Sequence, residues 1–207
     1  MSAFALSAVQ QQLVAHVREV AAAKLVALAE AGEPGYVNRE LIKAMGSHGL
    51  LARLFGGDDA ARTAAAMDLC LLRETLARIS TEAETALALQ GLGSYPFLLF
   101  GSDDVVSRWR PLVVSGDAVA AFALSEPGAG SDAGALTLRA EPDGDGWRLH
   151  GEKTWISNAP EADVYTVFAR TTQAAKARGV TAFVVAGDSA GLHGEHLNMT
   201  RPIPSAR

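Results

Sequence analysis

The sequence is poor in cysteine, which limits its covalent chemistry. Cys70 is the only cysteine among 207 residues, so no disulfide can form within the chain. That composition fits a reducing compartment. Cys70 lies in the apolar stretch Leu69–Leu72, and we predict that it is a small buried hydrophobe rather than a nucleophile.

Blocks of positive charge and long apolar runs are also missing. The net charge of −5 disfavours a polyanion such as nucleic acid as the main partner, and no basic block is suited to anionic lipid. No window of about 18 residues is free of charged and polar groups, so no transmembrane helix is predicted. Residues 1–13 lack the basic start and apolar run of a secretory signal. We therefore expect a soluble cytoplasmic protein without a membrane partner.

Helical periodicity dominates the chain up to about residue 118. Hydrophobic residues make up 49% of the sequence, enough to bury a core. Val9, Leu13, Val17 and Val20 are spaced by four, four and three, which places them on one helix face. Further helices are predicted after an Asn38 cap, over about 60–79, from a Thr81 cap with Glu84 to Gln90 or beyond, and over 103–114.

Beyond residue 120 the pattern changes to strands and turns. Residues 137–141 and 147–150 flank a glycine-rich turn and predict a hairpin, and residues 164–169 and 180–185 predict two more strands. Strands and helices do not alternate, which argues against a doubly wound sheet. The expected fold is α+β, with an all-α helical domain over 1–118 followed by a small antiparallel β-sheet or barrel-like domain over 119–207.

A glycine-rich segment, Phe122–Asp132, could hold a ligand. Its glycines allow close backbone approach, and Ser125 and Ser131 supply hydroxyls. Such a segment suits a flat polar heterocycle or a phosphate-rich tail, although an ordinary loop has the same composition. The dinucleotide fingerprint does not fit, because Gly128, Gly130 and Gly134 are spaced one residue too widely and a strand follows.

A second segment, Gly151–Ala159, contains Trp155, Ile156 and Ser157. On a regular strand, residues two apart share one side, so Trp155 and Ser157 would form an aromatic wall with a hydroxyl beside it. The alternative is a tryptophan packed into a β core.

Together the two segments, about 30 residues apart, resemble the middle β domain of the acyl-CoA dehydrogenase family. The resemblance extends roughly over residues 5–207 and is strongest over 97–186. It implies that the chain binds FAD through both segments. The cofactor-binding residues it implies are Phe122, Leu124, Ser125, Gly130, Ser131, Trp155, Ile156 and Ser157.

Each of these residues has an implied role. Leu124, through its backbone, and Ser125, through its hydroxyl, would bind the pyrimidine edge of the flavin, close to the aromatic ring of Phe122. Trp155 would pack on the isoalloxazine ring, with Ser157 near N5. A second group, formed by Gly130 and Ser131, would lie near the pyrophosphate or the pantetheine arm of the substrate, which makes Ser131 the candidate substrate-binding residue.

The implied reaction is dehydrogenation of an acyl-CoA, or another acyl thioester, to the α,β-enoyl thioester, with electrons passed to an electron-transferring flavoprotein. The complete enzyme would be a homo-oligomer, dimer or tetramer. Members of the family run to nearly twice this length, and their C-terminal helical bundle usually carries the catalytic base. We therefore expect the 207-residue chain to be truncated, to lack a catalytic residue and to be inactive alone. An oxidase or monooxygenase of the same superfamily and a non-catalytic flavin- or acyl-binding module are the alternatives.

Two further features have simpler explanations. Glu126 could serve as a general base, but the resemblance implies a structural role for it. His193 and His196 are three residues apart in a glycine-rich loop with no convincing third ligand, so no metal site is predicted.

Overall fold

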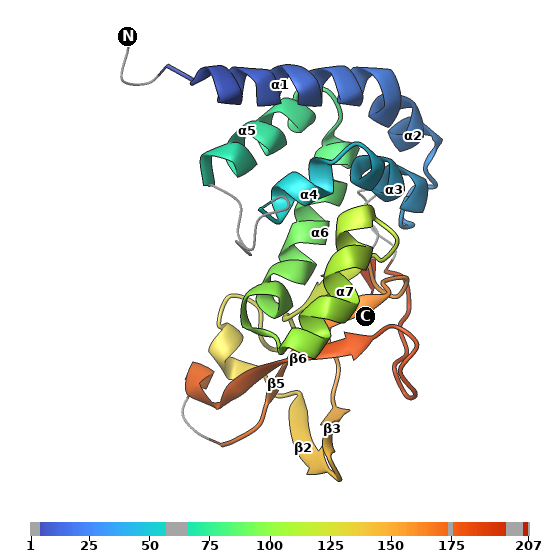
Figure 1. Cartoon of the computed structure of the whole chain (residues 1–207). Helices are drawn as coiled ribbons and strands as arrows, with labels where there is room; N and C mark the ends of the chain where they lie inside the picture. The colour runs from blue at the N-terminus through green and yellow to red at the C-terminus, as the bar shows by residue number, and fades with distance from the viewer. Residues whose placement is uncertain (1–4, 57–65, 174–175, 198–204, 207) are drawn as a thin grey trace.

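The structure, a computed structural model, describes residues 5–56, 66–173, 176–197 and 205–206. Its first part is helical, and its second part forms a sheet against which one long helix packs (Figure 1). The helical elements are α1 (Ala8–Val20), the π-helix η1 (Ala21–Leu25), α2 (Val26–Ala31), α3 (Arg39–Ser47), α4 (Leu50–Leu54), α5 (Ala66–Ala77), α6 (Thr81–Phe100) and α7 (Asp103–Ser115).

The helix starts follow from short polar side chains. The Asn38 side chain accepts a hydrogen bond from the Leu41 N–H, as predicted. The cap of α6 is Ser80 rather than Thr81: the Ser80 hydroxyl accepts from the Ala83 N–H, and Thr81 is the first helical residue. Both residues can cap, so the sequence alone left the start uncertain by one position. The predicted start of the third helix, near residue 60, lies outside the described residues.

Helix α6 extends beyond Gln90, as the prediction allowed, and continues through Gly91, Gly93 and Pro96 to Phe100. An interior proline lacks an N–H for the helix ladder and normally costs about 3 kcal/mol. Gly93 lies directly against strand β1 (Ala120–Ala123), where a Cβ would come within 2.7 Å of the Ala121 nitrogen. The glycine therefore serves close packing between the helix and the sheet rather than ending the helix.

The strands after β1 are β2 (Arg139–Asp143), β3 (Gly146–His150), β4 (Ile156–Ser157), β5 (Val164–Arg170), β6 (Val180–Ala186) and β7 (Ser205–Ala206), with 3-10 turns η2 (Ala133–Ala135) and η3 (Lys176–Gly179). Strands β2, β3, β5 and β6 lie where the sequence predicted strands, whereas β7 was not predicted. Strands β2 and β3 form the predicted hairpin.

The sheet is mixed rather than antiparallel throughout. Strand β5 pairs antiparallel with β6 but parallel with β1 and, at one position, with β2. Parallel neighbours need a long crossover connection, which residues 124–163 supply between β1 and β5. The α+β class with a helical N-terminal part is confirmed, and the strand directions correct the expected antiparallel sheet.

Buried polar contacts connect the helical part to the sheet. Gln90 on α6 is fully buried; its amide donates to the carbonyls of Val113 and Ala118, and its oxygen accepts from the Ala120 N–H at 3.0 Å. The Thr166 hydroxyl on β5 donates to a carbonyl of α6 at 2.7 Å. One hydrophobic core also runs through both parts. The division at residues 118/119 therefore stays a prediction.

The prediction that Cys70 is buried was wrong, because the structure shows it exposed. Helix α5 buries Leu71, Leu72 and Leu76, and Cys70 lies outside that face although its sequence neighbours are apolar. In the part of the chain that the structure describes, no helix is long and apolar enough to cross a membrane.

Candidate functional site

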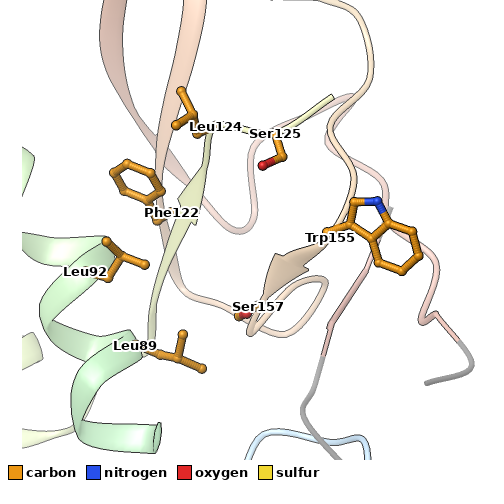
Figure 2. A pocket seen from close by; sticks show the side chains of 7 residues that line it. All are labelled: Leu89, Leu92, Phe122, Leu124, Ser125, Trp155 and Ser157. Carbon is orange, nitrogen blue, oxygen red and sulfur yellow. The ribbon is translucent and has the colours of Figure 1, made fainter. Parts of the chain in front are cut away.

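The two predicted segments meet at a small pocket beside α6 (Figure 2). Its volume is about 170 Å³, smaller than the roughly 300–1,000 Å³ of pockets that enclose a ligand. These residues therefore form a wall of a site rather than an enclosure. The pocket is lined by Leu89, Leu92, Phe122, Leu124, Ser125, Trp155 and Ser157.

One side of the pocket is apolar and is built by α6 and β1. Leu89 and Leu92 reach it from the helix, and Phe122 reaches it from the strand. Strand β1 buries Ala121 and Ala123 and leaves Phe122 half-buried, where its ring packs against Phe168 at 4.9 Å between centroids. Figure 2 shows the hydroxyls of Ser125 and Ser157 between this apolar side and the indole of Trp155. The combination of aromatic surface with two hydroxyls fits a flat, partly polar ring system.

The backbone that follows β1 is held by a buried carboxylate. Glu126 is 5% exposed, and its two oxygens accept hydrogen bonds from the N–H and hydroxyl of Thr137, the N–H of Leu138 and the ammonium of Lys153. We call Glu126, Thr137, Leu138 and Lys153 the Glu126 junction. It joins the first motif to the segment that leads into β2 and to the second motif.

The charges of this junction suit a structural role. Burial alone would raise the pKa of Glu126, but the hydrogen bonds from Lys153, Thr137 and Leu138 outweigh burial and hold that pKa below its usual value. A carboxylate with a depressed pKa and its acceptor sites engaged is a poor general base. The geometry therefore supports the structural role that the resemblance implied.

Trp155 reaches the pocket by a different route from the one predicted. Its backbone has φ 60°, a left-handed conformation that costs a non-glycine residue about 1–2 kcal/mol, so Trp155 does not belong to the regular strand β4. Both Trp155 and Ser157 line the pocket, but not because they alternate along one strand. Trp155 is 61% exposed, which also excludes the alternative of a tryptophan packed into the β core.

The remaining predicted residues lie away from this pocket. Ile156 is buried in the hydrophobic core, with 4% exposure. Gly130 and Ser131 are exposed in the loop after Glu126, and a Cβ at Gly130 would meet nothing within 4 Å. An open loop of this kind leaves room for an extended ligand, but the structure does not bring it to the pocket wall.

Three residues of the site were missed from the sequence. Leu89 and Leu92 sit on a helix that is apolar on most sides, so no periodic signal separated pocket residues from core residues. Lys153 was passed over because an isolated lysine usually lies on the surface. Its position two residues before Trp155, in a short segment between two β strands, was the available signal.

The histidine pair is held apart from this site. His196 packs on the ring of Tyr36 at 4.6 Å between centroids, and its Nε2 lies 3.6 Å from a Glu161 oxygen. Within the described ranges, no group of three or more His, Cys, Asp or Glu side chains is arranged to hold a metal ion.

Comparison with known proteins gives the chain its relatives. Residues 7–117 match the model of the acyl-CoA dehydrogenase N-terminal domain, and residues 121–204 match that of the acyl-CoA dehydrogenase middle domain. The glutaryl-CoA dehydrogenase of Desulfococcus multivorans is 35% identical over 190 residues, which cover 88% of this chain and 48% of that protein. The chain spans about half the length of this curated relative.

Solved structures share the fold. A glutaryl-CoA dehydrogenase from Mycobacterium smegmatis in complex with FADH2 superimposes with a TM-score of 0.83 at 28% identity, covering 97% of this chain and 52% of that one. A chain from work on the electron transferring flavoprotein of Acidaminococcus fermentans gives a TM-score of 0.86 at 27% identity, covering 98% of this chain and 55% of that one. Because the N-terminal domain model alone matches more than half of the residues, the chain belongs to the acyl-CoA dehydrogenase family.

Proposed function

We propose that this chain supplies the flavin-binding wall of an enzyme that dehydrogenates an acyl-CoA, or another acyl thioester, to the α,β-enoyl thioester. The observation that carries the proposal is the meeting of both motifs at one pocket with aromatic surface and two hydroxyls. The similarity to acyl-CoA dehydrogenases supports the substrate class. A solved relative in complex with FADH2 supports FAD as the cofactor.

The pocket residues fit the flavin in chemical terms. We assign the pyrimidine edge to the Leu124 backbone and the Ser125 hydroxyl, and the ring face to Trp155 with Ser157 near N5. Phe122 closes the apolar side together with α6. Gly130 and Ser131 lie in an open loop suited to the pyrophosphate or the pantetheine arm. Ile156, which lies between Trp155 and Ser157 in the sequence, contributes by packing in the core rather than through an exposed surface.

The chain's own residues bind and orient; they do not remove the substrate proton. FAD, if held by these residues, would provide a two-electron acceptor for the hydride removed from the substrate. Hydroxyl and N–H donors held rigidly at the pocket stabilise negative charge that develops near them. Unlike water molecules, they do not have to reorient as that charge forms. None of the residues that line the pocket, all within the described ranges, carries a carboxylate.

The remaining parts of the proposal concern partners. An electron-transferring flavoprotein would accept the electrons, in keeping with the likeness to a chain from work on such a protein. The complete enzyme would be a homo-oligomer in the cytoplasm.

Flavin titration tests the proposal directly. The 207-residue chain is titrated with FAD, and binding is followed by flavin fluorescence and by the visible spectrum. We expect weak but saturable binding, because the pocket is a wall rather than an enclosure. Ser125→Ala should weaken binding several-fold, whereas the control Ser47→Ala, on the surface of α3, should not.

Turnover is measured separately, with acyl-CoAs and an artificial electron acceptor. We expect no dehydrogenation by this chain alone, since no carboxylate lines the pocket. Failure of FAD to bind at millimolar concentration would overturn the flavin assignment. Rapid oxygen consumption by the reduced flavin would instead favour an oxidase or monooxygenase of the same superfamily.

A further inference from the structure

Lys153 lies at the point where the two motifs meet. Its side chain is 8% exposed, and its ammonium donates to the Leu124 carbonyl and to a Glu126 oxygen, both at 2.9 Å. A buried ammonium needs such partners to offset the loss of water. One of its two partners here belongs to the backbone of the pocket wall itself, since Leu124 lines the pocket.

The Leu124 carbonyl and the Ser125 N–H belong to the same peptide group. A cation on the carbonyl fixes the plane of that peptide and polarises its N–H, which makes the N–H a stronger donor to an acceptor in the pocket. The next peptide is fixed as well, because the Ser125 carbonyl accepts from the Thr154 N–H at 3.0 Å. Two consecutive residues, Lys153 and Thr154, thus hold both sides of Ser125.

Trp155 directly follows Lys153 and Thr154 in the chain, and its left-handed backbone leads into β4. Such a strained conformation at a bulky residue persists only where the surroundings impose it. Lys153 therefore connects the Leu124–Ser125 side of the pocket to the Trp155–Ser157 side.

We propose that Lys153 is a positioning residue for the flavin site: by binding the Leu124 carbonyl, it orients the Ser125 N–H and sets the spacing between the two sides of the pocket. The inference rests on the proposed flavin-binding function. It adds a residue that touches neither the pocket nor a ligand within it, and that acts through the backbone of residues that do.

The experiment measures the chain first without and then with FAD. Lys153→Met removes the ammonium, Lys153→Arg keeps a cation, and Glu126→Gln/Lys153→Met removes both charges so that no buried carboxylate is left unpaired. Arg139→Met is the matched control, because it also removes one cation but from an exposed ion pair on β2. In the FAD-free chain, the NMR resonances of the Leu124 carbonyl carbon and the Ser125 amide report the peptide's hydrogen bonding. FAD affinity is then measured by fluorescence titration.

We expect both variants without the ammonium to shift the Leu124 and Ser125 resonances and to weaken FAD binding by about tenfold, the loss typical of one charge-assisted hydrogen bond. Lys153→Arg should recover part of the affinity, and Arg139→Met should match the wild type. The double variant keeps the test decisive if Lys153→Met does not fold.

Wild-type FAD affinity in a folded variant without the ammonium would overturn the positioning role and leave the proposed function intact. Absence of FAD binding by the wild-type chain would overturn the proposed function, and the positioning role with it. The resonances of Leu124 and Ser125 in the FAD-free chain distinguish loss of the Lys153–Leu124 hydrogen bond from a general loss of structure. Arg139→Met leaves that bond in place and provides the reference spectrum.

Discussion

The Glu126 junction and Trp155 are neighbours in the chain, since Lys153 and Trp155 are two residues apart, but they are held in opposite ways. The junction is buried, charged and saturated with hydrogen bonds, whereas Trp155 is 61% exposed on a strained backbone. The Glu126 junction has the character of a structural core, whereas Trp155 has the character of a binding surface. The presence of a residue in a motif therefore does not reveal whether it touches a ligand or holds the other motif residues in place.

The largest effect is expected when the Lys153 cation is removed from the Glu126 junction. Lys153→Met leaves the Glu126 carboxylate buried without its cation, which should lower the free energy of unfolding by about 3–5 kcal/mol. Urea denaturation followed by far-UV circular dichroism measures this loss. The Glu126→Gln/Lys153→Met double variant should lose clearly less than the sum of the two single variants. Additive losses would mean that the two residues act independently.

A smaller effect should appear when acid neutralises the same carboxylate. The pKa of Glu126 is depressed in the folded chain by the junction, against a value of about 4.3 in unfolded chains. Its stabilisation is therefore complete above that unfolded value and is lost as pH falls through the lower folded value. The stability difference between wild type and Glu126→Gln should narrow from pH 6 to pH 3.

Asp117 provides the control for this measurement. Its pKa is also lowered, first by the hydrogen bond from Lys43, but the side chain is exposed. Asp117→Asn should therefore change the acid dependence much less than Glu126→Gln. An equal effect of the two substitutions would contradict the importance of burial.

At Trp155 the expected effect is smaller and of different origin. Because φ is 60°, Trp155→Gly should be about 1 kcal/mol more stable than Trp155→Ala. Both substitutions remove the indole and should weaken FAD binding to a similar extent. Thermal unfolding and FAD titration of the two variants separate backbone strain from ring contact, and equal stability of the two would argue against a left-handed backbone in solution.

The smallest effect is expected at an ion pair on the surface. A guanidinium nitrogen of Arg139 lies 3.9 Å from a carboxylate oxygen of Glu141, and both side chains are exposed. Arg139→Met should change the free energy of unfolding by no more than about 0.5 kcal/mol. A loss comparable with that of Lys153→Met would remove the contrast between buried and exposed pairs.

Much of the fold could be predicted from local patterns. The Asn38 cap, the β2–β3 hairpin and strands β5 and β6 follow from side-chain periodicity and turn chemistry. The continuation of α6 through Pro96 and the parallel pairing of β1 with β5 depend on contacts between distant segments, which periodicity does not carry.

The candidate site could be predicted in outline for the same reason. Motif resemblance located Phe122, Ser125 and Ser157, which the structure brings to one pocket. It could not distinguish Lys153 from a surface lysine, nor place Leu89 and Leu92, since burial and partners arise only in the folded chain. The exposure of Cys70 was missed because it depends on which face of α5 the residue occupies, and its apolar sequence neighbours do not show that face.

Helix α6 gives the pocket a rigid side. Along a single turn, Leu89 and Leu92 face the pocket, whereas Gln90 and Gly93 fasten the helix to the sheet through a buried amide and a close backbone contact. Helix α6 cannot move away from the pocket without breaking these contacts between the helical part and the sheet. Opening the pocket on this side should therefore require nearly global unfolding. Adaptation to a ligand, and the exchange of one ligand for another, would then fall to the opposite side, where a single exposed indole can turn.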